Sequence, residues 1–265
     1  MLSPDYLSIP GILLLFSFFF IVIIGRYFLV AGIFYGIFYL WYPEKWKNRK
    51  INPRHYQKQQ LFKEVKWSLI SSIIFAAAGC ATILLWQHGF TKVYEDPGKY
   101  GLLYLPVSLA VFMFVHETYY YWLHRWMHKP AIFKVVHQIH HNSHIPSPFT
   151  AFSFHPLEAT FQAIFLPIML MLLPMHYYII FLQLTVMTIS SVVNHLNIEI
   201  YPQRFHQHPL GRWLIGASHH SLHHKQYKYN FGLYFTFWDK LRNTESPFFC
   251  KLFEAKTSPE NSTKT

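Results

Sequence analysis

Histidine is distributed very unevenly along this chain. Of the 18 histidines in 265 residues, eight lie between residues 116 and 155, and seven lie between residues 195 and 224. The segment between these two windows contains only His176. Imidazole is a favoured ligand of iron, zinc, copper and nickel. We therefore expect the two histidine-rich windows to form a metal site.

The spacing inside the windows places several histidines on shared helix faces. On an α-helix, residues four positions apart differ by about 40° around the axis, and residues three apart by about 60°. The segment HRWMH therefore brings two imidazoles to one face, and HQIHH and HSLHH each spread three over about 100°. With one isolated histidine, the candidate ligands are His124, His128, His137, His140, His141, His195, His220, His223 and His224. Because one tetrahedral metal takes four ligands, this number indicates two metal ions.

Spacing alone leaves the third segment open, because His219, His220 and His223 also fall within about 100°. The sequence therefore does not choose between His219 and His224 as a ligand. Other residues are candidates for hydrogen bonds that orient the ligands. These are His116, Glu117, His155 and His219. The isolated histidines are expected to serve packing or solvation, and they are His55, His88, His176, His206 and His208.

The elements that must position these histidines are helices in a membrane. Hydrophobic residues make up 52% of the chain and charged residues 13%, whereas a soluble domain carries about 25% charged residues. Long apolar runs cover residues 9–41, 67–86, 102–115 and 161–193, and Pro174 and His176 divide the last one. We expect an all-α integral membrane protein with about four transmembrane segments, the last one a helical hairpin. The first run, which contains Arg26, is either one tilted helix whose Arg26 extends toward the membrane surface or a helix with an interfacial extension.

The basic residues indicate how the chain is oriented. Eight Lys or Arg residues lie between Lys45 and Lys66, flanked by apolar runs, and this is typical of a cytoplasmic loop. With residues 43–66 in the cytoplasm, the later spans return both histidine windows to that side as a helical cap. The net charge of +11 fits such a loop, so we expect no nucleic-acid partner. Cys80 and Cys250 lie far apart, so neither a disulfide framework nor a cysteine zinc site is expected.

Several longer segments resemble a known family. They are HETYYYWLHRWMH (116–128), HQIHHNSHIPSPFTAFSFHPLEA (137–159), NHLN (194–197), HHSLHH (219–224) and NFGLYFTFWDKLRNT (230–244). In order, spacing and flanks they are similar to the fatty acid hydroxylase/sterol desaturase superfamily. Within it, the stretch PSPFTAFSFHPLEA is closer to sterol C5-desaturases than to fatty-acid 2-hydroxylases. The apolar runs predict membrane spans in residues 1–100, and the resemblance implies a catalytic domain in residues 101–245. A polar tail, residues 246–265, is expected to be disordered.

The resemblance also implies a cofactor and a reaction. Members hold a di-iron centre with histidine ligands, which here implies iron bound by the nine candidates, with zinc as a substitute during overexpression. The centre activates O2 to desaturate or hydroxylate a lipid, either sterol-like or acyl. The sequence contains no flavin, haem or NAD motif, so electrons must come from a separate cytochrome b5- or ferredoxin-type reductase chain.

Two alternatives remain at this point. One is a hydroxylase of fatty acyl, alkylglycerol or carotenoid chains. The other, from a different class, is a metal transporter or a non-catalytic metal-binding membrane protein. A transporter places its ionisable ligands near the middle of the bilayer, whereas these histidines follow the apolar runs. The expected location is the endoplasmic reticulum in a eukaryote or the inner membrane in a bacterium.

Overall fold

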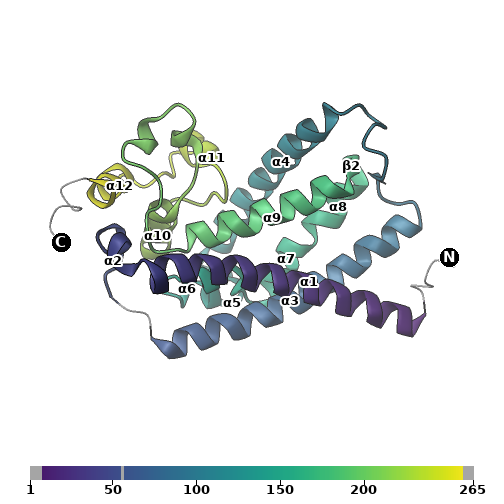
Figure 1. Ribbon diagram of the computed structural model, residues 1–265, viewed down its shortest axis with the longest axis horizontal. Coiled ribbons are helices and arrows are strands. Elements are labelled where there is room, and N and C mark those ends of the chain that lie inside the picture. The colour runs from purple at the N-terminus through teal and green to yellow at the C-terminus, as the bar shows by residue number, and fades with distance from the viewer. Residues whose placement is uncertain (1–7, 55–56, 259–265) are drawn as a thin grey trace.

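The computed structural model describes residues 8–54 and 57–258, and it is almost wholly helical (Figure 1). The all-α prediction is confirmed. The α-helices are α1 (Ile9–Tyr35), α2 (Pro43–Trp46), α3 (Lys58–Gln87), α4 (Tyr104–Met127), α5 (Pro130–Val136), α6 (Gln138–His141), α7 (Pro156–Ala163), α8 (Phe165–Leu172), α9 (Tyr177–Asn194), α10 (Ala217–Gln226), α11 (Phe237–Leu241) and α12 (Phe249–Thr257). The remaining elements are the π-helix η1 (Gly36–Trp41), the 3-10 helices η2 (Lys47–Arg49), η3 (Pro148–Phe152), η4 (Phe205–Gln207) and η5 (Gly211–Trp213), and the strands β1 (Val93–Tyr94) and β2 (Met175–His176).

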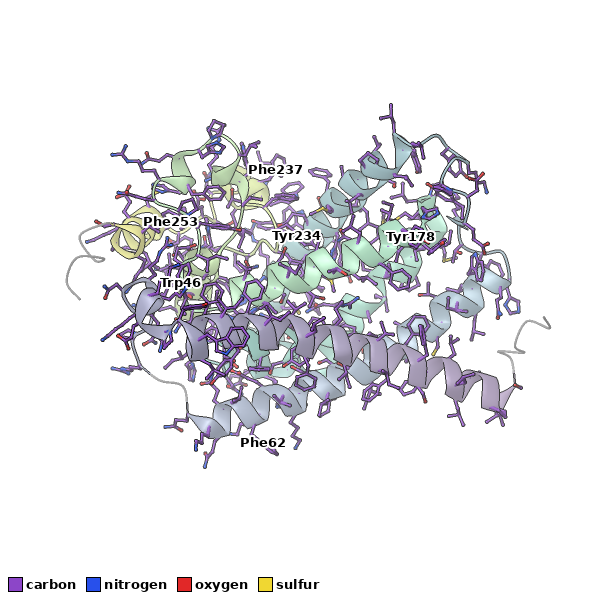
Figure 2. The ribbon with its side chains drawn as sticks, viewed as in Figure 1. Trp46, Phe62, Tyr178, Tyr234, Phe237 and Phe253 are labelled. Atoms are coloured by element: carbon purple, nitrogen blue, oxygen red, sulfur yellow. The ribbon has the colours of Figure 1, made fainter. Side chains whose placement is uncertain are left out.

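Three helices in the described part of the chain are long and apolar enough to cross a membrane. They cover Ile9–Trp41, where α1 continues into η1, Lys58–Gln87 and Tyr177–Asn194. Many of their large apolar side chains point outward, as Phe62 of α3 does with 73% exposure (Figure 2). This is the surface expected where lipid, and not water, surrounds a helix.

The predicted segments agree with these helices in position but differ in extent. The last apolar run is a hairpin as expected, because α8 ends at Leu172 and the short parallel pair of β2 with β1 leads into α9. The second span begins at Lys58, so the end of the basic segment 43–66 is helical. The run 102–115 is only the first half of α4, which continues to Met127. The second half carries His116 and Glu117, and α4 is not among the spanning helices, so the described residues contain three such helices where about four were expected.

The membrane-length helices share one core with the histidine-rich region. Ile23, Tyr27 and Ala31 of α1 pack with Ala76 of α3 and with buried residues of η3 and α9. Hydrogen bonds fix the backbone of η3 to these helices, including one from the Tyr27 hydroxyl to the Phe149 carbonyl at 2.8 Å. The helices α6 and α10 lie at the end of the molecule that carries α12, and β2 lies at the other end (Figure 1).

The tail prediction is wrong for residues 249–257, which form α12. Phe249 and Phe253 are buried there and pack against Leu222 of α10; Figure 2 labels Phe253 on this helix. The two phenylalanines lie four positions apart and so share one helix face, which supplies apolar burial in an otherwise polar segment. Residues 259–265 lie outside the described residues, as does His55.

Candidate metal centre

The structure brings the nine candidate ligands together in two groups. Within each group the imidazole nitrogens lie within 4.8 Å of one another. Cluster A consists of His124, His128, His137, His141 and His223. Cluster B consists of His140, His195, His220 and His224. All are buried except His128, which is half-buried.

The two clusters share helices, so neighbouring residues serve different clusters. In α6, His140 belongs to cluster B and His141 to cluster A. In α10, His223 faces cluster A, while His220 and His224 face cluster B. Adjacent helical residues differ by about 100° in direction, so a helix between two sites divides its ligands in this way. The rings of His141 and His224 lie 4.5 Å apart, centroid to centroid, and the clusters therefore adjoin.

Hydrogen bonds at the outer nitrogens reveal which atoms face the centre of cluster A. The Nδ1 atom of His124 lies 2.8 Å from the Phe231 carbonyl, and that of His137 lies 2.8 Å from the Glu158 carboxylate. The Phe231 carbonyl can only accept a hydrogen bond, so Nδ1 of His124 carries the proton, and the close carboxyl of Glu158 favours the same tautomer of His137. The Nε2 atoms then present lone pairs to each other at 3.1 Å. Two lone pairs this close repel unless a cation lies between them.

Cluster B repeats the arrangement with different partners. Nδ1 of His140 lies 3.3 Å from the Ser153 carbonyl, and Nδ1 of His195 lies 2.7 Å from the Ser191 carbonyl. Their Nε2 atoms are 3.1 Å apart. Nitrogens bound at about 2.1 Å from a metal and at right angles are separated by about 3.0 Å. The donor set of each cluster therefore fits a metal ion.

The protonation state of the rings favours ligation as well. Burial and then the neighbouring imidazoles lower the pKa of His140, His141, His220 and His223 well below the usual value. These rings are neutral near pH 7, which is the form that binds metals. Neither cluster includes a carboxylate or thiolate ligand. All-imidazole donors suit iron, zinc, copper or nickel, and not magnesium or calcium.

Glu158 has a role that sequence reasoning missed. Its side chain is fully buried, its Oε2 faces Nδ1 of His137, and its Oε1 accepts a hydrogen bond from Gln162 at 3.2 Å. A carboxylate behind a ligating histidine fixes the orientation of the ring and raises its basicity. In the sequence, Glu158 looks like an ordinary acidic residue in the first turn of α7.

Two buried carboxylates hold the backbone that supports His124. Glu117 accepts hydrogen bonds from the backbone N–H groups of residues 233–235. Asp239, also missed from sequence, accepts those of Phe231 and Gly232. A Cβ on Gly232 would lie 2.8 Å from a Glu117 oxygen, so only glycine permits this approach. Glu117 thus helps to fix the backbone segment whose Phe231 carbonyl orients the ring of His124.

The other residues expected to orient ligands lie outside direct contact with the clusters. His116 lies 2.8 Å from the Tyr234 hydroxyl through Nδ1. His155 caps α7 by accepting the Leu157 N–H. His219 stacks on Phe249 at 3.5 Å between centroids. It lies outside both clusters, and the geometry favours His224 as the ligand of the third segment.

Among the isolated histidines, His206 serves packing and not solvation. Its side chain is only 5% exposed, and its ring packs against Phe253 at 4.8 Å between centroids. Packing or solvation was expected for both His206 and His208, and His208 is exposed. The reason for the burial of His206 is α12, which covers it and was not expected to fold.

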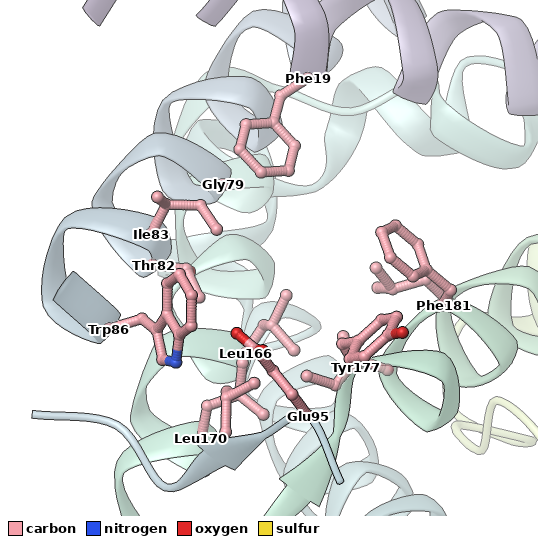
Figure 3. A pocket seen from close by; sticks show the side chains of 13 residues that line it. Phe19, Gly79, Thr82, Ile83, Trp86, Glu95, Leu166, Leu170, Tyr177 and Phe181 are labelled. Atoms are coloured by element: carbon pink, nitrogen blue, oxygen red, sulfur yellow. The ribbon is translucent and has the colours of Figure 1, made fainter. Parts of the chain in front are cut away.

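Apolar cavities lie between the long helices. One of about 540 Å³ is bounded by α1, α3, α8 and α9, and Figure 3 shows Phe19, Trp86 and Phe181 among its walls. A second, of about 120 Å³, shares Phe19 and Phe181 with it and reaches His116 on α4. Gly79 permits a close approach of α1, because a Cβ there would lie 2.9 Å from the Phe19 ring. Cavities of this kind suit an apolar ligand that enters from the bilayer.

Comparisons with known proteins point in one direction. The family model described as fatty acid hydroxylase matches residues 109–244. Human lathosterol oxidase is 31% identical over 187 residues, which cover 69% of this chain and 60% of the human protein. The Delta(7)-sterol 5(6)-desaturase of Candida glabrata is 29% identical over 193 residues, which cover 72% of this chain and 50% of that protein. The protein of the same name from Leptosphaeria maculans is 30% identical and covers 80% of this chain.

The matches cover only part of the length of each relative. The chain spans 60% of the length of the human relative and 50% of the Candida one. No solved structure matches the chain. All nine histidines of clusters A and B fall inside the region that the family model matches.

Proposed function

The chain belongs to the fatty acid hydroxylase family, and from this premise we propose that it oxidises a membrane lipid with O2. The proposal assigns one iron ion to each histidine cluster. When bound, the irons would supply O2 activation for attack on an unactivated C–H bond, giving an alcohol or an alkene. The observation that supports this most strongly is the set of lone pairs that face each other in both clusters.

The protein's own residues fix the ligands. Carbonyls of Phe231, Ser153 and Ser191 accept hydrogen bonds from ligand Nδ1 atoms, and the carboxyl group of Glu158 lies 2.8 Å from Nδ1 of His137. Each of these rings is thereby held in one tautomer and one orientation. Side chains of the clusters that are at most 5% exposed, such as that of His140, keep bulk water away from the reacting lipid.

We propose a sterol-like or acyl lipid as the substrate. Two of the relatives carry sterol desaturase names, and a third is named an oxidase of lathosterol. The cavity beside α9 is lined mainly by apolar side chains and adjoins outward-facing apolar surface. A lipid that enters from the bilayer would remain in apolar surroundings along this path.

An external electron donor follows from the stoichiometry. Reduction of O2 to water takes more electrons than one lipid oxidation supplies, so each turnover needs two from a cytochrome b5- or ferredoxin-type reductase chain. We expect the purified protein with NAD(P)H and O2 alone to leave lipids unchanged. Addition of a reductase and its carrier should start O2 uptake and give products detected by mass spectrometry. Turnover at the same rate without the reductase would contradict this requirement.

We also propose that the histidine clusters lie on the cytoplasmic side of the endoplasmic reticulum or bacterial inner membrane. Support comes from the exposed lysines of the segment between η1 and α3, which lies at the same end of the molecule as α10 (Figure 1). Positive residues next to spans favour the cytoplasm.

Cysteine labelling tests this orientation. Cys80 and Cys250 are first replaced. Single cysteines are then introduced at Lys45, Lys228 or Gly98, which are exposed positions. A membrane-impermeant thiol reagent should reach Lys45→Cys and Lys228→Cys from the cytoplasmic side, and Gly98→Cys only from the opposite side. Labelling of the first two from opposite faces would refute a shared cytoplasmic cap.

The proposed catalytic domain, residues 101–245, contains every member of both clusters. Residues 1–100 contribute α1 and α3, whose side chains pack on η3 and line the cavities. We propose that these spans both anchor the protein and form part of the lipid-binding site.

A further inference from the structure

Arg26 is a charged residue in an unusual place. It lies near the midpoint of the 33-residue apolar segment Ile9–Trp41. Instead of extending to the membrane surface, its side chain lines the smaller cavity. Its Nε atom is buried and has no hydrogen-bond partner, and no acidic side chain among residues 8–54 and 57–258 pairs with it. A guanidinium inside a membrane protein is costly unless an oxygen group faces it.

Gln183 provides a second unpaired polar group in the same cavity. The residue is 1% exposed, and its Nε2 donates to the Tyr234 hydroxyl at 2.9 Å. Its Oε1 has no partner among the described residues. If the amide is flipped, the other amide atom is left unpaired. In the flipped orientation the Tyr234 hydroxyl donates to Oε1, and the unpaired Nε2 group in the cavity wall can donate to a carboxylate.

The rest of the cavity wall determines what kind of ligand fits. The two cavities share Phe19, Leu166 and Leu184, so apolar walls continue from Arg26 outward. The outer part ends near Trp86 and Tyr177, as Figure 3 shows. The charged side chain lining that outer part is Glu95, which is acidic. A negative group is thus disfavoured at the outer part and attracted to the inner part.

We propose that the inner cavity, at Arg26 and Gln183, binds the carboxylate of an acidic lipid whose chain extends outward toward Trp86. This deepens the proposed function by naming the polar end and the orientation of the substrate. A carboxylate supplies the counter-charge and can accept two parallel N–H bonds from a guanidinium. A hydroxyl could pair with either group but leaves the positive charge without compensation.

The carboxylate end would lie on the side of the cavity nearest the histidines. Gln162 lines the smaller cavity and donates to Glu158, which contacts His137 of cluster A. His116, on the same wall, precedes His124 by two helical turns, about 12 Å along α4. The acidic lipid therefore enters with its polar end first.

A binding experiment tests this without requiring turnover. The purified full-length protein in neutral detergent is titrated with a fluorescent conjugated polyene fatty acid and with the polyene alcohol of the same chain. Charge-assisted hydrogen bonds are worth about tenfold or more in affinity. Arg26→Met should weaken acid binding by about that factor and leave alcohol binding nearly unchanged. Arg26→Lys should retain part of the preference for the acid.

Controls separate this site from general effects. Arg212→Met removes an exposed arginine that stacks on Trp213, remote from the cavities, and should bind both probes like the wild type. Equal loss of acid and alcohol binding in Arg26→Met, or no loss, would overturn the proposal. A preference for the alcohol in the wild type would also overturn it and indicate a neutral lipid. If acid binding depends on Arg26 but no lipid is ever oxidised, the proposed function fails and this inference stands.

Discussion

We expect His223→Ala and His140→Ala each to abolish lipid oxidation and to reduce bound metal from about two ions per chain to about one. His223 belongs to cluster A and His140 to cluster B, so each variant attacks one site. Both rings are fully or almost fully buried and hold their orientation through Nδ1, so each substitution removes a nitrogen that is fixed in place within its cluster. Elemental analysis of the purified protein and a lipid oxidation assay with the reductase chain measure the two effects.

His208→Ala is the matched control, because it deletes the same side chain at an exposed position. It should keep wild-type metal content and activity. His206 is unsuitable as a control, because its ring packs under α12. Full metal content in His223→Ala would contradict the assignment of a metal ion to cluster A. Fewer than one metal per chain in active wild-type protein would contradict a two-metal centre.

Glu158→Leu should weaken metal binding at cluster A by about 10- to 100-fold. The substitution removes the carboxyl group that lies 2.8 Å from Nδ1 of His137, so the buried ring loses the polar group that faces it. Glu158→Gln retains an acceptor oxygen and nearly the same shape, so a smaller effect is expected. Competition with a coloured chelator measures the affinity, and circular dichroism checks that the helices remain.

Glu44→Leu serves as the comparison for this pair of variants. Glu44 is exposed and pairs only with the exposed Lys47, so its loss should leave metal affinity unchanged. If Glu158→Leu binds metal as tightly as Glu44→Leu does, the contact with His137 is structural only. Loss from cluster B instead of cluster A would also contradict the assignment.

The identity of the candidate ligands could be derived from sequence because helical spacing is a local property. His124 and His128 are four residues apart and do face the same cluster. The division of His140 and His141 between clusters could not be derived in this way. It depends on where α4, α9 and α10 lie around α6, and these contacts join residues that are distant in sequence.

The supporting residues were harder to predict, because their roles exist only in the tertiary structure. Asp239 and Glu117 are separated by more than a hundred residues, yet both bind the strand-like segment after Asn230. The folding of α12 likewise depends on Leu222, which covers Phe249 and Phe253. The polar composition of this segment predicted disorder. Composition alone does not show that two of its aromatic residues share one helix face.

The attachment of η3 to the long helices determines whether the N-terminal spans could be exchanged for others. Tyr27 and Ser68, in α1 and α3, both bind the Phe149 carbonyl, and Ser71 binds that of Phe154. Between these two anchors lies Ser153, whose carbonyl orients His140. The N-terminal helices are therefore not an interchangeable anchor. A chimaera that grafts foreign spans onto residues 101–245 would need to reproduce these hydroxyl groups to keep cluster B intact.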